Sequence, residues 1–527
     1  MTPQQNASWR ITKPAITSRH GIVASQSRVA ATIGAQIMAQ GGNAVDAAIA
    51  TSFALGAAEP WMSGMGGGGY MVVRPKDGPA QVLEFGMRAP AGLRVDDYPI
   101  VGGKANDLFP WPAVQDDRNV FGATAVAIPG QVAGMALAHE TFATKPWGDL
   151  IAPAIKLADD GLPVDWFAQL IIGGSARDLH PFAASRETFL DDAGFPKSSG
   201  WTALGETRCD LSRLAASLRV IAEKGASGFY EGPLAESIIR DLQTAGGRHT
   251  LQDLATYRAN LVDASEHDYR GHKIVGTPTL TAGPTLARAL ALMAEGWQAD
   301  GAAPDATAYA AYDAAIRQAN HERYDTMGDV ENEPDPSCTS HFSVVDADGT
   351  MVAVTQTLLS IFGSRLMLPG SGILMNNGIM WFDPEQGKPN SLGPGKRCLA
   401  NMCPTVLERS DGALFALGAS GGRKIMPAVA QLTSMVLDYG MDLDTALHTP
   451  RIDMSLAEVT IADDSLPPKV LDGLRSALPH PVTPAPRTIF PLHFACPSAV
   501  SRQDGINAGA TEVMTPWADA VAADDHG

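Results

Sequence analysis

The sequence predicts a mixed α/β (α+β) fold, and three observations lead to this expectation. The chain has 527 residues and is 45% hydrophobic, which suffices for a large core, either as one large α/β domain or as two lobes. From about residue 120 to residue 320, apolar residues recur mostly with helical spacing. After residue 339 the chain instead carries short runs rich in Val, Thr and Phe, separated by turn signals, as strands do.

The N-terminal part predicts a helical hairpin. The stretch "SQSRVAATIGAQIMAQGG", residues 25–42, has helical periodicity and ends at Gly41, where a left-handed C-terminal cap favours glycine. A second helical stretch follows over residues 43–60, with Asn43 as its N-cap and Asp46 in its first turn. Because most of the side chains are small, we expect the two helices to pack closely.

The next stretch, "WMSGMGGGGYMVV", matches the G-x-G-x-x-G spacing at Gly64, Gly66 and Gly69. A dinucleotide site requires a strand before these glycines and a helix after them, whereas here a helix precedes and the strand-like "YMVV" follows. We therefore interpret the glycines as a tight backbone crossing.

The middle of the chain predicts a helical region that ends in a linker. The helical segments are residues 128–143, 150–161, 211–225, 233–247 and 306–324. The acidic, proline-containing stretch "DTMGDVENEPDPSC", residues 325–338, has no periodicity and leads directly into Thr339. We expect it to be exposed.

The second half predicts strands, over residues 341–357, 372–382, 404–420 and 457–464. The "DADG" turn signal makes residues 339–357 a hairpin about Asp348, in which paired residue numbers sum to about 696. Thr339 then lies across from Thr357. A second hairpin, "ERSDGAL", brings the following "GASGGRK" to a similar strand end.

The charge and hydropathy of the chain limit the kinds of partner and the location that we expect. The formal net charge is −18 and no block of like charges appears, which argues against a nucleic-acid partner and favours a small molecule. No run of apolar residues is long enough to cross a membrane. The N-terminus shows no secretory signal, so we expect a cytoplasmic protein, or a periplasmic one if a leader has been removed.

Cysteine and histidine spacing predicts no cofactor and no metal. The five cysteines are odd in number and include no CxxC pair, which disfavours a disulfide framework and a thiolate zinc site. The twelve histidines show no HExxH or clustered spacing, and His341 is better explained as part of the strand start than as a ligand.

Thr339 is a candidate nucleophile. A threonine hydroxyl needs a base, and no GxSxG elbow with a Ser-His-Asp pattern supplies one. Cleavage of the Cys338–Thr339 bond would free an α-amino group with a pKa of about 7.7–8.0 on the same residue. Thr357 would then hydrogen-bond the Thr339 hydroxyl, and the N–H groups of Gly421 and Gly422 would form an oxyanion hole. The alternative is that these residues only begin a strand and form a turn.

Motifs over nearly the whole chain resemble one family. They are "GGNAVDAAIATSFALGAAEPWMSGMGGGGYMVV", "AIPGQVAGMALAHETF", "PAIKLADDGLPV", "TSHFSVVDADGTMVAVTQT", "GSGILMNN", "PGKR", "CPTV" and "GASGGRKI". Together they are similar to the γ-glutamyltransferase (γ-glutamyltranspeptidase) family of N-terminal nucleophile hydrolases.

The resemblance implies a four-layer αββα sandwich and a precursor that cuts itself before the first residue of a T-[TS]-H motif. Here that bond is Cys338–Thr339, so the large subunit would be residues 1–338 and the small subunit residues 339–527. The two would form a heterodimer, or a dimer of heterodimers. The resemblance also implies that Thr339 is the nucleophile, Thr357 its hydroxyl partner, and Gly421 with Gly422 the oxyanion glycines.

The family's substrate-binding residues are only partly present. The arginine of its R-E-x-A-P motif is replaced by Gly86, with Arg88 displaced by two residues, and the asparagine two residues beyond the second threonine is Leu359. The N-N-[EQ]-M-D-D-F motif becomes "NNGIMWF", which keeps Asn377 but places Trp381 where the family is polar. The paired serines of S-S-M-[SC]-P are Ala400 and Asn401.

These differences predict an altered donor. An α-ammonium group without its acceptors would be left unpaired, and Trp381 would narrow the pocket or form an apolar wall. Arg88, Arg423 and Lys424 remain as candidates for pairing with a carboxylate, the alternative being ordinary surface or structural charges. The candidate substrate-binding residues are thus Arg88, Asn377, Trp381, Asn401 and Arg423.

The sequence therefore predicts an autoprocessing threonine amidohydrolase that forms an acyl-enzyme on Thr339 and hydrolyses a small carboxylated amide, with an oxamate-like or acylase-type donor. One alternative is a glutathione hydrolase or γ-glutamyl transpeptidase. Another is a non-catalytic relative that acts as a binding protein.

Overall fold

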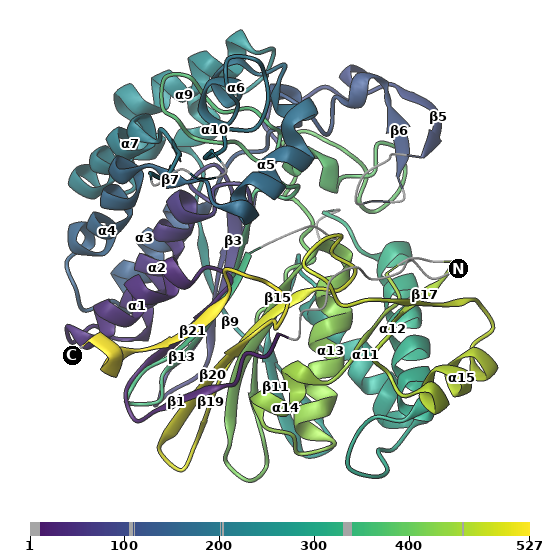
Figure 1. Cartoon of the computed structure of the whole chain (residues 1–527). Coiled ribbons are helices and arrows are strands. Elements are labelled where there is room, and N and C mark those ends of the chain that lie inside the picture. The colour runs from purple at the N-terminus through teal and green to yellow at the C-terminus, as the bar shows by residue number, and fades with distance from the viewer. Residues whose placement is uncertain are drawn as a thin grey trace.

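The protein is a sandwich of two stacked β-sheets with helices on both outer faces (Figure 1). The computed structural model describes residues 11–104, 109, 111–200, 202, 205–329, 340–455 and 458–526. Strand β12 of one sheet packs on β15 and β19 of the other, so the sheets face each other. The predicted αββα class is confirmed.

We call the first sheet the β12 sheet. Within the described residues it has seven strands, and every neighbouring pair is antiparallel. In spatial order these are β21 (Asp519–Ala522), β2 (Ile22–Ser25), β12 (Ser340–Val345), β13 (Met351–Thr357), β3 (Gly68–Arg74), β4 (Gln81–Phe85) and β9 (Asn260–Asp263).

The second sheet, called the β15 sheet, also has seven antiparallel strands in the part of the chain that the structure describes. In spatial order these are β1 (Ile16–Ser18), β20 (Ile506–Thr511), β19 (Cys496–Gln503), β15 (Leu414–Ser420), β14 (Thr405–Glu408), β11 (His272–Gly276) and β10 (Ser265–Tyr269). Short pairs and a three-stranded sheet lie outside the two main sheets: β5 (Ile100–Lys104) with β6 (Pro112–Val114), β7 (Leu162–Pro163) with β8 (Arg208–Cys209), and β16 (Ile452–Asp453), β17 (Thr460–Asp463) and β18 (Val482–Ala485).

Helices α1, α2 and α3 pack on the β12 sheet, and α4 and α7 form a further layer beyond them. The helices of this half are α1 (Arg28–Ala39), α2 (Ala44–Ala58), α3 (Gln131–Phe142), α4 (Trp147–Asp160), α5 (Trp166–Leu179), α6 (Ala183–Phe189), α7 (Ser212–Lys224), α8 (Ser227–Tyr230), α9 (Gly232–Thr244) and α10 (Leu251–Ala255).

The β15 sheet is covered by α11, α13 and α14, with α12 packed on α11 and α13. This half contains α11 (Gly283–Gly296), α12 (Ala306–Thr326), α13 (Ile425–Leu437), α14 (Leu443–His448) and α15 (Pro468–Ala477). Among the described residues, no helix is both long and apolar enough to cross a membrane.

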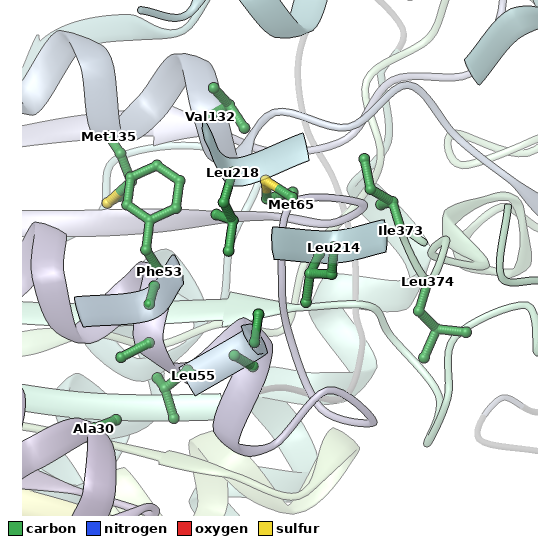
Figure 2. Close-up of a cluster of buried hydrophobic side chains, with 14 of the residues drawn as sticks. Ala30, Phe53, Leu55, Met65, Val132, Met135, Leu214, Leu218, Ile373 and Leu374 are labelled. Carbon is green, nitrogen blue, oxygen red and sulfur yellow. The ribbon is translucent and has the colours of Figure 1, made fainter. Parts of the chain in front are cut away.

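The predicted N-terminal helical hairpin is confirmed. The α1 helix ends before Gly41, whose φ is +82°, and Asn43 and Asp46 form a reciprocal capping box at the start of α2. All of α2 except Gly56 is buried. Figure 2 shows part of the core around it, in which Phe53 and Leu55 lie among side chains from α3 and α7. The small residues let α2 lie between the sheet and its outer helices.

The strand predictions are confirmed except one. Residues 340–345 pair with residues 356–351 in the predicted register, and Ser340 lies opposite Gln356. Residues 372–382, however, were expected to form a strand and do not: they form a loop that ends in a 3₁₀ turn at Gly378–Trp381. The side-chain oxygen of Asn376 accepts the N–H groups of Ala127 and Gly378, and side-chain bonds of this kind replace a strand ladder.

Candidate active site

The described candidates for catalysis, Thr357, Gly421 and Gly422, lie at strand ends, as does Ser340, the neighbour of Thr339. Ser340 begins β12, Thr357 ends β13, and Gly421 follows the last residue of β15. Thr339 and Cys338 lie outside the described residues, as does most of the predicted linker. Ser340 is the first described residue after the predicted cleavage site.

Thr357 is held where the backbone of a glycine crosses it. Its side chain is buried, and its hydroxyl oxygen accepts a hydrogen bond from the N–H of Leu359 at 2.7 Å. A Cβ at Gly67 would lie 2.0 Å from the Thr357 carbonyl oxygen. Gly67 was not one of the glycines predicted to lie at a backbone crossing. Of those three, Gly66 and Gly69 are crowded by backbone oxygens, at 2.2 Å and 2.4 Å from an added Cβ, whereas the nearest atom to a Cβ at Gly64 is 3.4 Å away.

The glycine pair after β15 forms a sharp turn. Gly421 has a φ of +127° and Gly422 a φ of +67°, values that favour glycine. The turn leads through a 3₁₀ segment, Gly422–Lys424, into α13. A Cβ at Gly421 would lie 3.0 Å from the Cα of Ala495, so the turn is also tightly packed.

One glutamine links the two strand ends across the sandwich. Gln26 is almost fully buried, and its side-chain oxygen accepts the N–H of His341 at 3.1 Å. Its side-chain nitrogen donates to the hydroxyl of Ser420 at 2.6 Å. This residue joins the start of β12 to the end of β15.

His341 is placed as a structural side chain. Its Nδ1 lies 2.9 Å from the Thr355 hydroxyl and its Nε2 lies 2.9 Å from the Ser343 hydroxyl. Burial lowers its pKa to about 3, so the imidazole is neutral at physiological pH. The ring packs against β15, because a Cβ at Gly418 would lie 2.4 Å from its Cε1. It helps to join the two sheets.

Leu359 and Trp381 belong to one buried apolar cluster. Leu359 has a φ of +84°, a left-handed conformation that is strained for leucine. Trp381 is 0% exposed, and its indole N–H has no hydrogen-bond partner among the described residues. Asn377 is also buried, and its amide bonds the backbone N–H of Ser360 at 3.0 Å and the Ser360 hydroxyl at 2.9 Å.

Asn401 is a buried amide without partners. The residue is 3% exposed, and within the described residues neither its Oδ1 nor its Nδ2 is hydrogen-bonded. The backbone on either side is fixed: the Ala400 N–H donates to Leu280, and Met402 accepts from Ala282. A native protein rarely buries both ends of an amide unpaired, so the side chain is a candidate for contact with a ligand.

The basic candidates lie at different depths. Arg88 is exposed, and its backbone pairs with Ile128 and Arg397. Arg423 is partly exposed in the turn after the glycine pair. Next to it, the Lys424 ammonium donates to the Leu492 carbonyl at 2.7 Å. The described contacts bring neither arginine into an ion pair.

Comparisons with known proteins agree with this geometry. The family model described as gamma-glutamyltranspeptidase matches residues 30–335 and 305–489. The chain belongs to the γ-glutamyltranspeptidase family. It is 28% identical to a glutathione hydrolase proenzyme of Pseudomonas sp. (strain A14) over 484 residues, covering 83% of this chain and 82% of that protein.

The chain is also similar to acylases. It is 32% identical to the acylase ACY 1 proenzyme of Pseudomonas sp. (strain SE83) over 517 residues, covering 90% of this chain and 89% of the relative. The crystal structure of cephalosporin acylase from Bacillus halodurans superposes with a TM-score of 0.85 at 23% identity, covering 99% of both chains, and shows the same fold. This family member is thus an enzyme of the N-terminal nucleophile amidohydrolase and acyltransferase type.

In this γ-glutamyltranspeptidase family member, position 86 is crowded by the end of a tyrosine side chain. A Cβ at Gly86 would lie 2.6 Å from the hydroxyl oxygen of Tyr70. The Tyr70 hydroxyl donates to the Leu280 carbonyl at 3.2 Å, and the Tyr257 hydroxyl donates to the Gly86 carbonyl at 2.7 Å. The side chains of Tyr70 and Tyr257, both buried, therefore lie next to Gly86.

The sequence did not predict a role for Gln26 or for the buried polar side chains that bond to β13. Gln356 bonds Ser52 and Ser63, and Gln131 donates to the same Ser52 hydroxyl at 2.8 Å. Polar residues inside apolar helical and strand patterns are the available signal, since a buried polar group needs partners. The signal does not identify those partners.

We expect Gly67→Ala to lower the free energy of unfolding by about 1–3 kcal/mol, because the new methyl group collides with a backbone oxygen that cannot move alone. The measurement is urea denaturation of the purified protein. Gly174→Ala is the matched control, since Gly174 lies exposed in α5 with no atom within 4 Å of an added Cβ. That change should be neutral or stabilising by up to about 1 kcal/mol. Equal stability of Gly67→Ala and the control would refute the crowded crossing.

Proposed function

We propose that the chain cuts itself between Cys338 and Thr339 and then acts as an amidohydrolase with Thr339 as its nucleophile. The observation that supports this most directly is the register of the hairpin, in which Ser340 pairs with Gln356. If this register continued by one position, Thr339 would lie opposite Thr357, at the sheet end that carries the Gly421–Gly422 turn.

The two resulting chains would stay together. β12 would belong to the small subunit, residues 339–527, but it pairs with β2 of residues 1–338, and β13 pairs with β3. In the other sheet β1 pairs with β20 and β11 with β14. Each sheet is thus built from both chains, which supports a heterodimer.

The proposed reaction is acyl transfer through Thr339. Its free α-amino group takes the hydroxyl proton while the oxygen attacks the amide carbon of the donor. The oxyanion that forms would face the N–H groups of Gly421 and Gly422. The amine leaves with the proton, an ester remains on Thr339, and water hydrolyses that ester to release the acid.

The donor is proposed to be a small carboxylated amide that lacks an α-ammonium group. Leu359 and Trp381 are buried apolar side chains where the family's motifs place polar groups, and Gly86 stands where those motifs place the arginine. Arg88 and Arg423 are the proposed partners of the donor carboxylate, and Asn401 is proposed to bind a polar group of the donor. Asn377 would act on this site through Ser360, which it bonds twice.

Glutathione hydrolysis remains the second candidate function. It is favoured by the similarity to glutathione hydrolase proenzymes, which extends over more than four-fifths of the chain. An acylase-type donor is favoured equally by the similarity to the ACY 1 proenzyme.

The first test is the intact mass of the purified protein beside Thr339→Ala. We expect two fragments that meet at the Cys338–Thr339 bond in the wild type and one full-length chain in the variant, because the variant lacks the attacking hydroxyl. A wild type that stays whole for days at neutral pH would contradict the proposed nucleophile, since no free α-amino group would then exist.

The second test compares donors. Hydrolysis of oxamate is measured by the release of ammonia, and hydrolysis of γ-glutamyl-p-nitroanilide by the release of p-nitroaniline. We expect kcat/KM for oxamate to be at least about tenfold higher. The γ-glutamyl donor carries an ammonium group, and each of its hydrogen bonds that is not made costs about 1–3 kcal/mol. Thr339→Ala is the blank for both assays. Robust release of p-nitroaniline would instead support the glutathione hydrolase function.

The third test is Asn401→Leu. If Asn401 binds the donor, kcat/KM should fall about 10- to 100-fold, whereas the free energy of unfolding should stay equal or rise, because a buried unpaired amide is removed. Thr433→Val is the control, since the Thr433 hydroxyl in α13 is likewise buried without a partner in the described part of the chain. The control should keep full activity. A destabilised Asn401→Leu with unchanged kcat/KM would assign the residue to the fold.

A further inference from the structure

We propose that Gln26 is a positioning residue that holds the start of β12 at a fixed distance from the turn after β15. Gln26 lies in the short connection between β2 and α1, directly before Ser27, the N-cap of α1. It is not part of any motif that led to the family. The inference rests on the proposed function, in which these two elements carry the nucleophile and the oxyanion glycines.

The pairing of β2 with β12 ends just before Gln26. β2 and β12 pair in a register in which Ser25 lies opposite Phe342. The next position in that register places residue 26 opposite His341, but β2 has already ended at Ser25. The side-chain oxygen of Gln26 accepts the His341 N–H at 3.1 Å, so the side chain replaces the backbone acceptor that a longer strand would supply.

Gln26 also contacts the β15 sheet. The side-chain nitrogen of Gln26 donates to the Ser420 hydroxyl at 2.6 Å. Ser420 is the last residue of β15 and immediately precedes Gly421. Backbone hydrogen bonds join strands within a sheet and do not cross between layers, so this buried amide sets the spacing of the two layers at this point.

The two residues that Gln26 bonds lie next to the proposed catalytic residues in the chain. His341 is two residues after Thr339, and Ser420 is one residue before Gly421, so a single side chain joins the two halves of the proposed catalytic centre. Acyl transfer depends on the distance between a nucleophile and its oxyanion donors, and a displacement of about 1 Å costs about 100-fold in rate. Gln26 is therefore assigned an indirect role, exerted through the two strands to which it is bonded.

The test uses Gln26→Met, which keeps the length and volume of the side chain and removes both hydrogen bonds. On mature protein and the best donor amide of the wild type, we expect kcat to fall about 10- to 100-fold with KM changed by less than about twofold. Gln26→Glu keeps an acceptor for the His341 N–H, so its kcat should be intermediate. This second variant also serves if Gln26→Met does not mature.

Asn507→Leu is the matched control. Asn507 in β20 is another buried amide between the layers: its nitrogen donates to the carbonyls of His20 and Asp346, and its oxygen accepts from Arg502. It lies at the opposite end of the sandwich, where Asp346 follows β12. We expect a similar loss of thermal stability from this change and an unchanged kcat.

The outcomes separate the two proposals. A wild type that neither matures nor hydrolyses any donor amide overturns the proposed function, and the positioning role falls with it. A wild type that is active, together with a Gln26→Met variant whose kcat equals that of Asn507→Leu, overturns the positioning role alone. A rise in KM at constant kcat would also overturn it, since it would place Gln26 in substrate binding.

Discussion

The pairing of β12 with β2 on one side and β13 on the other is the constraint on which the rest of the structure depends. It places a strand from the second half of the chain in the middle of a sheet built by both halves. Because β12 is covered by α2 on one face and by β15 and β19 on the other, neither its register nor its tilt can change without moving both layers. The end of β13, the glycine crossing and the Gln26 link all take their positions from this strand.

The left-handed conformation of Leu359 is held by one local hydrogen bond and by apolar packing. Its φ is +84°, which is unusual for leucine, and its N–H donates to the Thr357 hydroxyl at 2.7 Å. Its side chain is buried in the same apolar cluster as Trp381. The end of β13 is thus tied to this cluster through a single turn of the chain.

Much of the fold could be predicted from the sequence where the signals were local. Gly41, Asn43 and Asp46 identify helix ends because caps depend on a few adjacent residues, and the "DADG" turn fixes a hairpin register because the side-chain period of a strand is two. Residues 372–382 were wrongly expected to be a strand, since an apolar run does not reveal that Asn376 will bond the backbone around it. The same limit explains why the role of Gln26 was not predicted, since its hydrogen-bond partners are 315 and 394 residues away in the chain. For the site, the sequence indicated which residues to consider, and only the structure gave the crowding around Gly67 and Gly86.

The crowding at Gly86 limits how this enzyme can change over evolution. The Tyr70 hydroxyl stands 2.6 Å from where a Cβ would begin, and it is itself fixed to Leu280. A side chain at position 86 therefore requires Tyr70 to shift or to be replaced, and replacing Tyr70 alone by a small residue would open a buried cavity. Positions 70 and 86 are thus coupled, so that a change at either one is felt at the other.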